Sequence, residues 1–381
     1  MTRFAPDRLV LPALAAGLVG LAALVALTFA SMAQALAGLL AAALFLLGLP
    51  LGALTLLMVH RLTGGRWGAA LRGPLRAIVA TLPLPLFLLL PVLAGTHLVF
   101  PWAGVDPATL PEAVRHKLVW LAPPWLALRF VACAAVWLAL AWAVLGWRPA
   151  GDAGDAATAA RERRTAALGL VVHALAVTVL SIDWMMSLEP EFHSTIYAML
   201  EAAGEVAGAC ALAMVLLALA VPVEGLPGGG EDATLGEDVA NMQFGFVAMW
   251  AYLAFMQWLI VWAADLPREI HWYMLRGQGG WLVVLWLMVA LHFALPAAGF
   301  LARPVKRSPR GFLWLGVAVL AGHFLDVWWR VRPPLAPDMP TALPFDLAAV
   351  LGAGGLWAAL LLFVLADDRR LARWRARGRH G

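Results

Sequence analysis

The chain has 381 residues, of which 63% are hydrophobic and only 13% are charged, and its mean hydropathy is +0.83. A soluble domain carries about a quarter charged residues, so this composition excludes a soluble globular protein and predicts a polytopic membrane protein. The net charge of +4 does not predict nucleic-acid binding. Most basic residues fall in short loops between apolar runs, where orientation in the bilayer accounts for them.

Apolar runs of about 20 residues, separated by charged residues, Pro or Gly, predict ten transmembrane helices in a single all-α membrane domain covering residues 1–381. The predicted ranges are 9–30, 36–59, 76–99, 122–146, 166–183, 194–222, 240–264, 279–302, 311–330 and 345–366.

Both ends of the chain are predicted to lie in the cytoplasm. The number of predicted spans is even, and the basic residues concentrate in the loops on the side of the two termini. Residues 367–381 form a predicted basic cytoplasmic tail. The first run follows Arg3 and Arg8, as in a signal peptide. It is longer than the usual signal core of about 7–15 residues and a second run follows at once, so we expect a membrane helix.

Cysteine usage limits the cofactors that the chain can hold. Cys133 and Cys210 are the only cysteines, and both fall inside apolar runs. The sequence therefore has no CxxCH or CxxC motif for covalent haem, an iron–sulfur cluster or structural zinc. Redox chemistry would need a partner subunit or a cofactor that is not covalently bound.

The stretch from Leu180 to Glu205, LSIDWMMSLEPEFHSTIYAMLEAAGE, carries the most unusual polar residues. Asp183 lies at the end of one predicted helix, and Glu201 and Glu205 lie inside the next. Glu201 is expected about 10 Å below the outer boundary, and Glu205, one turn further on, shares its helix face. Helix capping cannot explain carboxyl groups at this depth, so they predict proton or polar-ligand handling.

Other polar residues are expected in the same outer half of the bilayer. Arg129 lies at a depth similar to that of Glu201, and His323 and Asp326 can share one helix face, on which the carboxylate could orient the imidazole. His292 is expected nearer the midplane. The candidates for a proton path are Asp183, Glu201, Glu205, His292, His323, Asp326 and Arg129.

Structural roles for the same residues stay open. Arg129 could form an ion pair with Asp183 or Asp326 that locks helices together, and Asp183 could cap a helix at a solvated bend. His173 and His292 are the one histidine pair that could bind haem b from opposite helices. Burial would favour a protonated carboxyl at Glu201, whereas an ion pair with Arg129 would favour the carboxylate.

Five segments, in matching order, resemble one family, the ActF-type integral membrane subunit of bacterial alternative complex III. They are HKLVWLAPPWLALRF, SIDWMMSLEPEFHSTIYAM, EDVANMQFGFVAMWAYLAFMQWLIVWAADLPREIHWY, HFALPAAGFLARPVKRSPR and HFLDVWWRVRPP. In this resemblance Arg129, Asp183, His292 and Asp326 match polar positions of the family motifs. Glu201 and Glu205 fall where the family is expected to carry uncharged residues.

The resemblance implies a membrane subunit of a respiratory quinol:electron-acceptor oxidoreductase in the bacterial inner membrane. Such a subunit lies among lipids beside an ActC/NrfD-like membrane subunit and partners that carry iron–sulfur clusters and c-type haems. It is expected to supply scaffold and a proton path, with any quinone shared with or bound by a partner, and not to be the catalytic subunit itself. Two alternatives stay open, a proton-coupled secondary transporter and a structural or assembly protein of a terminal oxidase.

Overall fold

The computed structural model describes residues 5–147, 156–220 and 233–377, and of 233–235 and 368–377 it describes the backbone only. Within these ranges the chain forms helices and no strands, which confirms the all-α prediction. The longer helices are α1 (Pro6–Thr28), α2 (Met32–Thr63), α3 (Arg66–Val79), α9 (Pro123–Gly146), α10 (Ala156–Trp184), α11 (Tyr197–Ala220), α12 (Ala233–Ala263), α13 (Pro267–Arg276), α14 (Gly279–Met288), α17 (Pro309–Val331) and α18 (Met339–Arg377). Short helical segments between them are α4 (Pro83–Leu88), α5 (Leu90–Ala94), α6 (Thr96–Val99), α7 (Glu112–Arg115), α8 (Leu118–Leu121), α15 (Leu295–Leu301) and α16 (Arg303–Arg307).

Ten helical spans in the described residues are long and apolar enough to cross a membrane, as predicted, so the chain is a multi-pass membrane protein. The fifth span begins at Ala156 rather than at residue 166. The third span differs by as much and begins at Arg66 rather than at residue 76. Its first turns are amphipathic, with Leu71 and Leu75 buried while Arg72 is not, so a search for uninterrupted apolar residues passes over them. The helix is then interrupted before Pro83, since proline cannot continue the backbone hydrogen-bond ladder.

The last span also differs from prediction. It begins at Met339 rather than at residue 345, and α18 continues to Arg377. The predicted basic tail, 367–381, therefore starts within this helix; its side chains from residue 368 and all of 378–381 lie outside the described residues.

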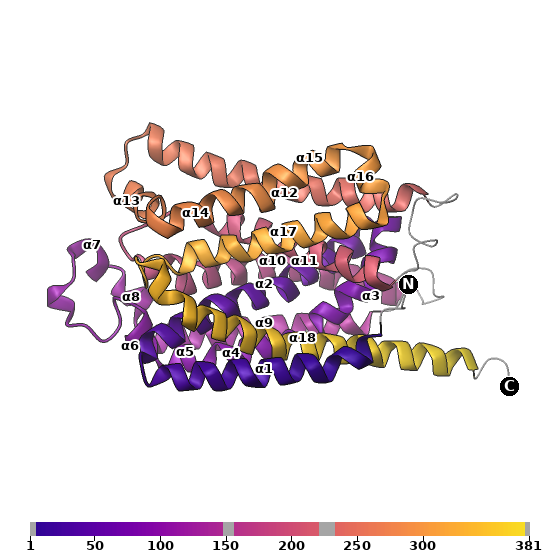
Figure 1. Ribbon diagram of the computed structural model, residues 1–381, viewed down its shortest axis with the longest axis horizontal. Helices are drawn as coiled ribbons and strands as arrows, with labels where there is room; N and C mark the ends of the chain where they lie inside the picture. Colours follow the sequence, from indigo (N-terminus) through magenta and orange to yellow (C-terminus); the bar gives the residue numbers. More distant parts are fainter. Residues whose placement is uncertain (1–4, 148–155, 221–232, 378–381) are drawn as a thin grey trace.

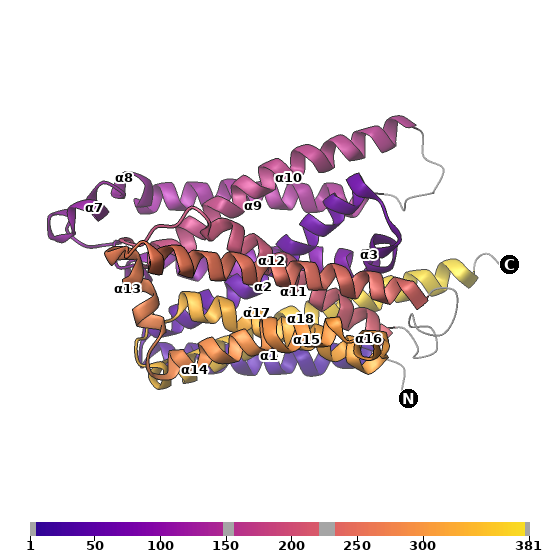
Figure 2. The ribbon, with the colours of Figure 1, turned by 90° about the horizontal axis from the view of Figure 1, so that it is seen from above.

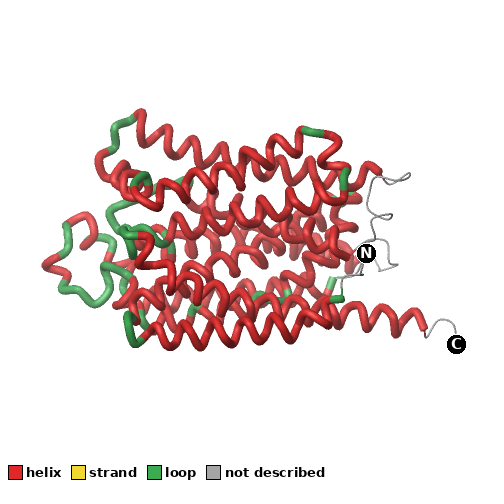
Figure 3. Tube along the Cα trace, in the orientation of Figure 1, coloured by secondary structure: helices red, strands yellow, loops and turns green. Residues whose placement is uncertain are grey.

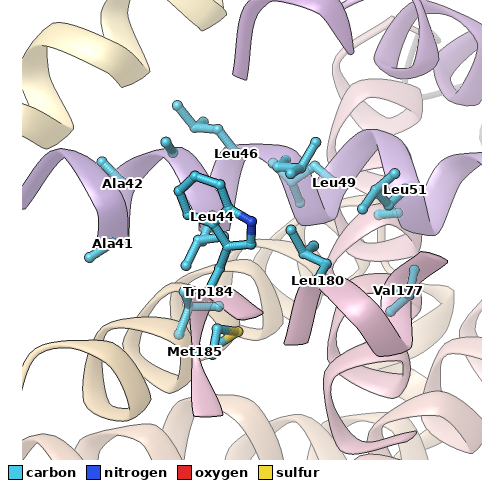
Figure 4. Packing of buried hydrophobic residues seen from close by; sticks show 14 of the residues in the cluster. Ala41, Ala42, Leu44, Leu46, Leu49, Leu51, Val177, Leu180, Trp184 and Met185 are labelled. Carbon is cyan, nitrogen blue, oxygen red and sulfur yellow. The ribbon is translucent and has the colours of Figure 1, made fainter. Parts of the chain in front are cut away.

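Helix α2 forms the centre of the bundle. In its apolar 18-residue stretch, 83% is buried, against 17% in that of α1. The helix contacts α3, α10, α11 and α18. Figure 4 shows Trp184 and Leu180 of α10 turned towards the leucines of α2. Because α2 is apolar around its whole circumference, as a helix surrounded by other helices must be, it provides a framework against which α11 is held.

Helix α1 is peripheral and packs along α18 (Figure 1). Glycines permit the close approach, since a Cβ atom on Gly17 would lie 2.6 Å from the backbone nitrogen of Leu356. The other side of α1 exposes leucine, valine and phenylalanine side chains. We therefore assign that side to lipid contact.

Loops gather at the two ends of the bundle, as Figure 3 shows. One of them, which we call the bend end, carries residues 185–196, α13 and the connection between α17 and α18. The start of α1 and the end of α18 lie together at the opposite end (Figures 1 and 2). This arrangement agrees with an even number of spans, and the assignment of that end to the cytoplasm stays a prediction.

Candidate functional site

Six polar side chains meet inside the bundle near the bend end, and we call them the buried cluster. Each is at most 2% exposed. They are Glu201 and Glu205 of α11, His323, Asp326 and Arg330 of α17, and His292 of the segment between α14 and α15. The structure therefore brings together five of the seven predicted proton-path residues.

Arg330 organises one half of the buried cluster. Its Nε and Nη2 atoms donate to the two carboxylate oxygens of Asp326 at 3.1 and 2.8 Å. Asp326 lies one helical turn before Arg330, so this pair forms along a single face of α17. The third guanidinium nitrogen, Nη1, lies 2.5 Å from Oε2 of Glu201 and forms an ion pair that links α17 to α11.

Glu205 and the two histidines form the other half of the buried cluster. Several of their polar atoms make no hydrogen bond to other described residues. Oε1 of Glu205 and both ring nitrogens of His292 and His323 are buried and have no hydrogen-bond partner among the described residues. A Cβ atom on Gly48 would lie 3.2 Å from Cγ of Glu205 and 3.6 Å from Nε2 of His323, so these two side chains adjoin at α2. The ring centroids of His323 and His292 are 5.9 Å apart.

Glycines on α11 make this arrangement possible. A Cβ atom on Gly204 would lie 3.1 Å from Cε1 of His323, and one on Gly208 would overlap the same ring. The imidazole therefore fits against α11 only because both positions lack side chains. The small-residue face of α11 accommodates the buried cluster as well as packing helices.

A π-helical segment, Val289–Ala294, presents His292 to α17. Pro296 follows four residues after His292; it has no backbone N–H to donate to the carbonyl of His292, and its ring crowds that carbonyl. The widened turn relieves this conflict, as wide turns within α-helices commonly do. Gly322 of α17 lies against the backbone of His292, and the imidazole stacks on Trp250 with a centroid distance of 4.0 Å.

The other two predicted residues, Arg129 and Asp183, form a separate pair between α9 and α10. Nε and Nη2 of Arg129 donate to the two oxygens of Asp183 at 2.7 and 3.0 Å. Trp120 donates to the same carboxylate at 2.8 Å, and the Arg129 guanidinium lies 4.1 Å from its ring centroid. The expectation that Arg129 could pair with Glu201 was wrong, because similar depth does not make two helices neighbours. This geometry is that of the structural ion pair left open above.

We expect Arg129→Ala to lower the yield and the thermal midpoint of the folded protein. The substitution would leave the carboxylate of Asp183, which is 1% exposed, with Trp120 as its remaining side-chain donor. Breaking a buried ion pair from one side costs about 3–5 kcal/mol. Size-exclusion chromatography of the detergent-solubilised protein measures the yield, and Arg129→Ala/Asp183→Ala should recover part of the loss. Normal yield of Arg129→Ala would contradict a structural role.

Arg330 was not among the predicted site residues because the predicted helix, 311–330, ended at that residue, where a charge is expected to face water. The i, i+4 spacing from Asp326 was the available signal. Arg276 and Arg332 lie between the predicted helices, and both are buried as well. Nη1 of Arg276 lies 2.5 Å from Oε1 of Glu189, and Nε of Arg332 lies 2.8 Å from Oδ1 of Asp346. Burial raises the pKa of Glu189, and the positive charge of Arg276 opposes that shift.

His173, the proposed partner of His292 in a haem site, is engaged elsewhere. Its Nε2 atom lies 3.0 Å from the hydroxyl oxygen of Thr55 on α2. His292 instead stacks on Trp250 beside His323. Among the described residues, no group of three or more His, Cys, Asp or Glu side chains could hold a metal ion.

The segments α14, Val289–Ala294 and α15 are consecutive and form one span, which we call the α14–α15 helix. A pocket of about 960 Å³ opens between α12 and the α14–α15 helix and ends at the buried cluster. Aromatic side chains such as Phe255, Trp258 and Trp286 line its wall, and Asp326 and Arg330 lie at its inner end. Phe255 and Trp286 are 53% and 64% exposed on the outside of the bundle, so the pocket opens towards lipid.

At the bend end of this pocket lies Tyr273. Its hydroxyl oxygen accepts a hydrogen bond from Nε2 of Gln257 at 3.0 Å, and Oε1 of Gln257 accepts one from Ser194 at 2.8 Å. Burial raises the pKa of Tyr273 to about 12. The phenol therefore keeps its proton at physiological pH and can donate it in a further hydrogen bond.

The arrangement combines a lipid-accessible apolar pocket with buried acids and histidines that can exchange protons. Comparison with models of known protein families finds no match, and comparison with curated proteins finds none either. The geometry and chemistry of these side chains are therefore the basis for assigning a function.

Proposed function

We propose that this protein is a membrane subunit of a bacterial respiratory quinol:electron-acceptor oxidoreductase of the alternative complex III type. In this role it supplies part of the membrane scaffold and a proton path near the quinone. The observation that carries the proposal is the buried cluster. It holds three carboxyl groups against one guanidinium, together with two histidines whose ring nitrogens make no hydrogen bond within the described part of the chain.

The charge balance of the buried cluster favours proton handling over a purely structural role. Arg330 can compensate one carboxylate fully, yet Glu201, Glu205 and Asp326 are all at most 2% exposed. Uncompensated negative charge is costly in a low-dielectric interior, so carboxyl groups placed in this way suit the uptake and release of protons. Glu205, His323 and His292 lie in succession from α11 to the π-helical segment and offer a route for those protons.

Electron transfer is assigned in this proposal to partner subunits. The two cysteines of the chain lie in different helices, so neither a CxxCH nor a CxxC motif exists in the sequence. An ActC/NrfD-like membrane subunit and subunits with iron–sulfur clusters and c-type haems would complete the complex in the inner membrane.

The direction in which the pocket opens supports this function over solute transport. A transporter for a water-soluble compound needs a route from an aqueous phase to a site near the midplane. The pocket that ends at Asp326 and Arg330 is instead entered past Phe255 and Trp286 on the lipid-facing side. A substrate dissolved in the bilayer, such as a quinol, has direct access to it.

We expect Glu205→Gln to leave assembly intact and to lower the proton-coupled turnover of the complex by about 10²-fold. Glutamine has nearly the shape of glutamate but cannot release a proton at this position. The tagged protein should first be purified in mild detergent from its native membrane, and its co-purifying chains and haem spectrum identified. Quinol-driven proton release by the purified complex, reconstituted in vesicles, then measures the effect.

Glu112→Gln is the matched control, because the Glu112 side chain is 78% exposed on α7 and lies outside the buried cluster. It should turn over as the unmodified complex does. Full turnover of Glu205→Gln would contradict the proton path. Recovery of the chain without any iron–sulfur or haem subunit would contradict the respiratory role itself.

A further inference from the structure

We propose that the pocket between α12 and the α14–α15 helix is a quinone site belonging to this chain, with the head group between Tyr273 and Asp326. The inference deepens the proposed function and rests on it. It assigns to this subunit a ligand of its own, an isoprenoid quinone or its quinol, in place of one held only by a partner.

The length of the pocket fits a ligand with an extended apolar tail. Along α12 its lining runs from Phe244 to Trp258, which corresponds to about 21 Å at 1.5 Å of rise per residue. Several side chains along this wall are small, since Ala248, Ala251 and Ala254 line the pocket. Alanines in a row leave a smooth groove in which a flexible isoprenoid chain can lie.

The polar groups lie in the half of the pocket towards the bend end, where Trp250 donates a hydrogen bond to Asp326 and Gln257 donates one to Tyr273. Tyr273 is hydrogen-bonded as an acceptor from Gln257, so its own hydroxyl hydrogen remains to be donated, for example to a quinone carbonyl. Oδ1 of Asp326 accepts one bond, from Nε of Arg330, and has a second lone pair that can accept a quinol hydroxyl. Quinone and quinol are thus both accommodated.

The charge at this end favours a neutral head group over a phospholipid phosphate. Among the residues that line the pocket, Arg330 is the cation, and its nitrogens are engaged by Asp326 and Glu201. A phosphate would lie beside the carboxylate of Asp326 with no unpaired cation to compensate it, which is unfavourable at low dielectric. A quinone brings no charge.

Aromatic rings around the head-group end add a surface for a planar ligand. Trp272 and Trp329 pack edge to face with a centroid distance of 5.3 Å, and Trp250 of α12 also lines the pocket. Offset stacking and edge contacts with such rings contribute to the binding of a flat, apolar ring. The site therefore matches the head group in polarity and shape, and the remaining apolar part of the pocket can take the start of the tail.

The test is the binding of decylubiquinone, and of a short-chain menaquinone analogue, to the purified full-length chain in lipid nanodiscs. Quenching of tryptophan fluorescence reports occupancy, since tryptophans line the pocket. We expect Ala251→Trp, which fills the middle of the groove, to weaken binding at least about tenfold. Tyr273→Phe should weaken it about fivefold through loss of one hydrogen bond.

Ala135→Trp on α9 is the matched control, because it adds the same side chain at an exposed position on another helix. It should bind as the unmodified chain does. If Ala251→Trp does not fold, Tyr273→Phe decides. Unchanged affinity in the folded variants would overturn the proposal, as would extraction of a tightly bound phospholipid that Ala251→Trp displaces while quinone fails to compete.

Quinone binding and co-purification are independent measurements, and they test the pocket and the proposed function separately. A chain that co-purifies with iron–sulfur and haem subunits but binds neither quinone analogue contradicts the pocket assignment alone. A chain that binds quinone through Tyr273 yet co-purifies with no redox subunit supports the site and contradicts the proposed function.

Discussion

Arg330→Met is expected to lower the free energy of unfolding by about 3–5 kcal/mol. The guanidinium is 1% exposed and pairs with Asp326 on its own helix and with Glu201 on α11. Methionine can fill much of the space, but it leaves two carboxyl groups buried without a cation, and desolvation then acts on both. The thermal midpoint and the monodisperse yield in detergent measure the loss.

Arg310→Met serves as the control, since Arg310 lies exposed in the first turn of the same helix. It should change the thermal midpoint little. Adding Glu201→Gln and Asp326→Asn to Arg330→Met should recover stability, because replacing every charged partner removes the unpaired charge. A midpoint for Arg330→Met equal to that of Arg310→Met would show that the ion pairs do not hold α11 and α17 together.

Helix number and type could be predicted because they depend on local composition. Each span needs only a run of apolar residues long enough to cross the bilayer, and the sequence shows such runs directly. Predicted helix boundaries were wrong where that signal is absent. At Arg66 an amphipathic helix begins, in which arginines alternate along the sequence with buried leucines. The same limit hid Arg330, which follows the last long apolar stretch of α17.

The members of the candidate site could be predicted in part, because carboxyl groups inside an apolar run are conspicuous in any single sequence. Glu201, Glu205 and Asp326 were found in this way, and they do lie together. The partners of these residues could not be predicted from the sequence, because packing between distant segments decides which helices are neighbours. Arg129 therefore had several possible partners by depth, and the fold pairs it with Asp183.

The family resemblance stays a prediction. It rests on five sequence segments in matching order. Those segments form helices of the bundle, and a helical bundle does not by itself specify one activity. The π-helical turn at His292 was not predicted, although the sequence carries Pro296 four residues later. A proline at that spacing disturbs the carbonyl of the residue it follows, which makes His292 a marked position independently of any family.

Close packing of α2 on α11 holds Glu205 in place, and a single glycine permits it. A Cβ atom on Gly52 would overlap the carbonyl oxygen of Glu205 and would lie 2.9 Å from Cβ of Ala209. The obstruction is backbone, which cannot rotate away as a flexible side chain can. The two helices can therefore approach to this distance only with glycine at position 52.

We expect Gly52→Leu to separate α2 from α11 and to destabilise the fold by about 3 kcal/mol. Because α2 is the centre of the bundle, the strain cannot be relieved towards lipid, and the yield of monodisperse protein should fall sharply. Gly245→Leu on α12 makes the same substitution where a Cβ atom would meet no described atom within 4 Å, and it should be tolerated. Thermal midpoints of both variants in detergent provide the comparison. Equal midpoints would mean that α2 and α11 do not approach this closely in the membrane, and Glu205 would then lose the contact that fixes it beside His323.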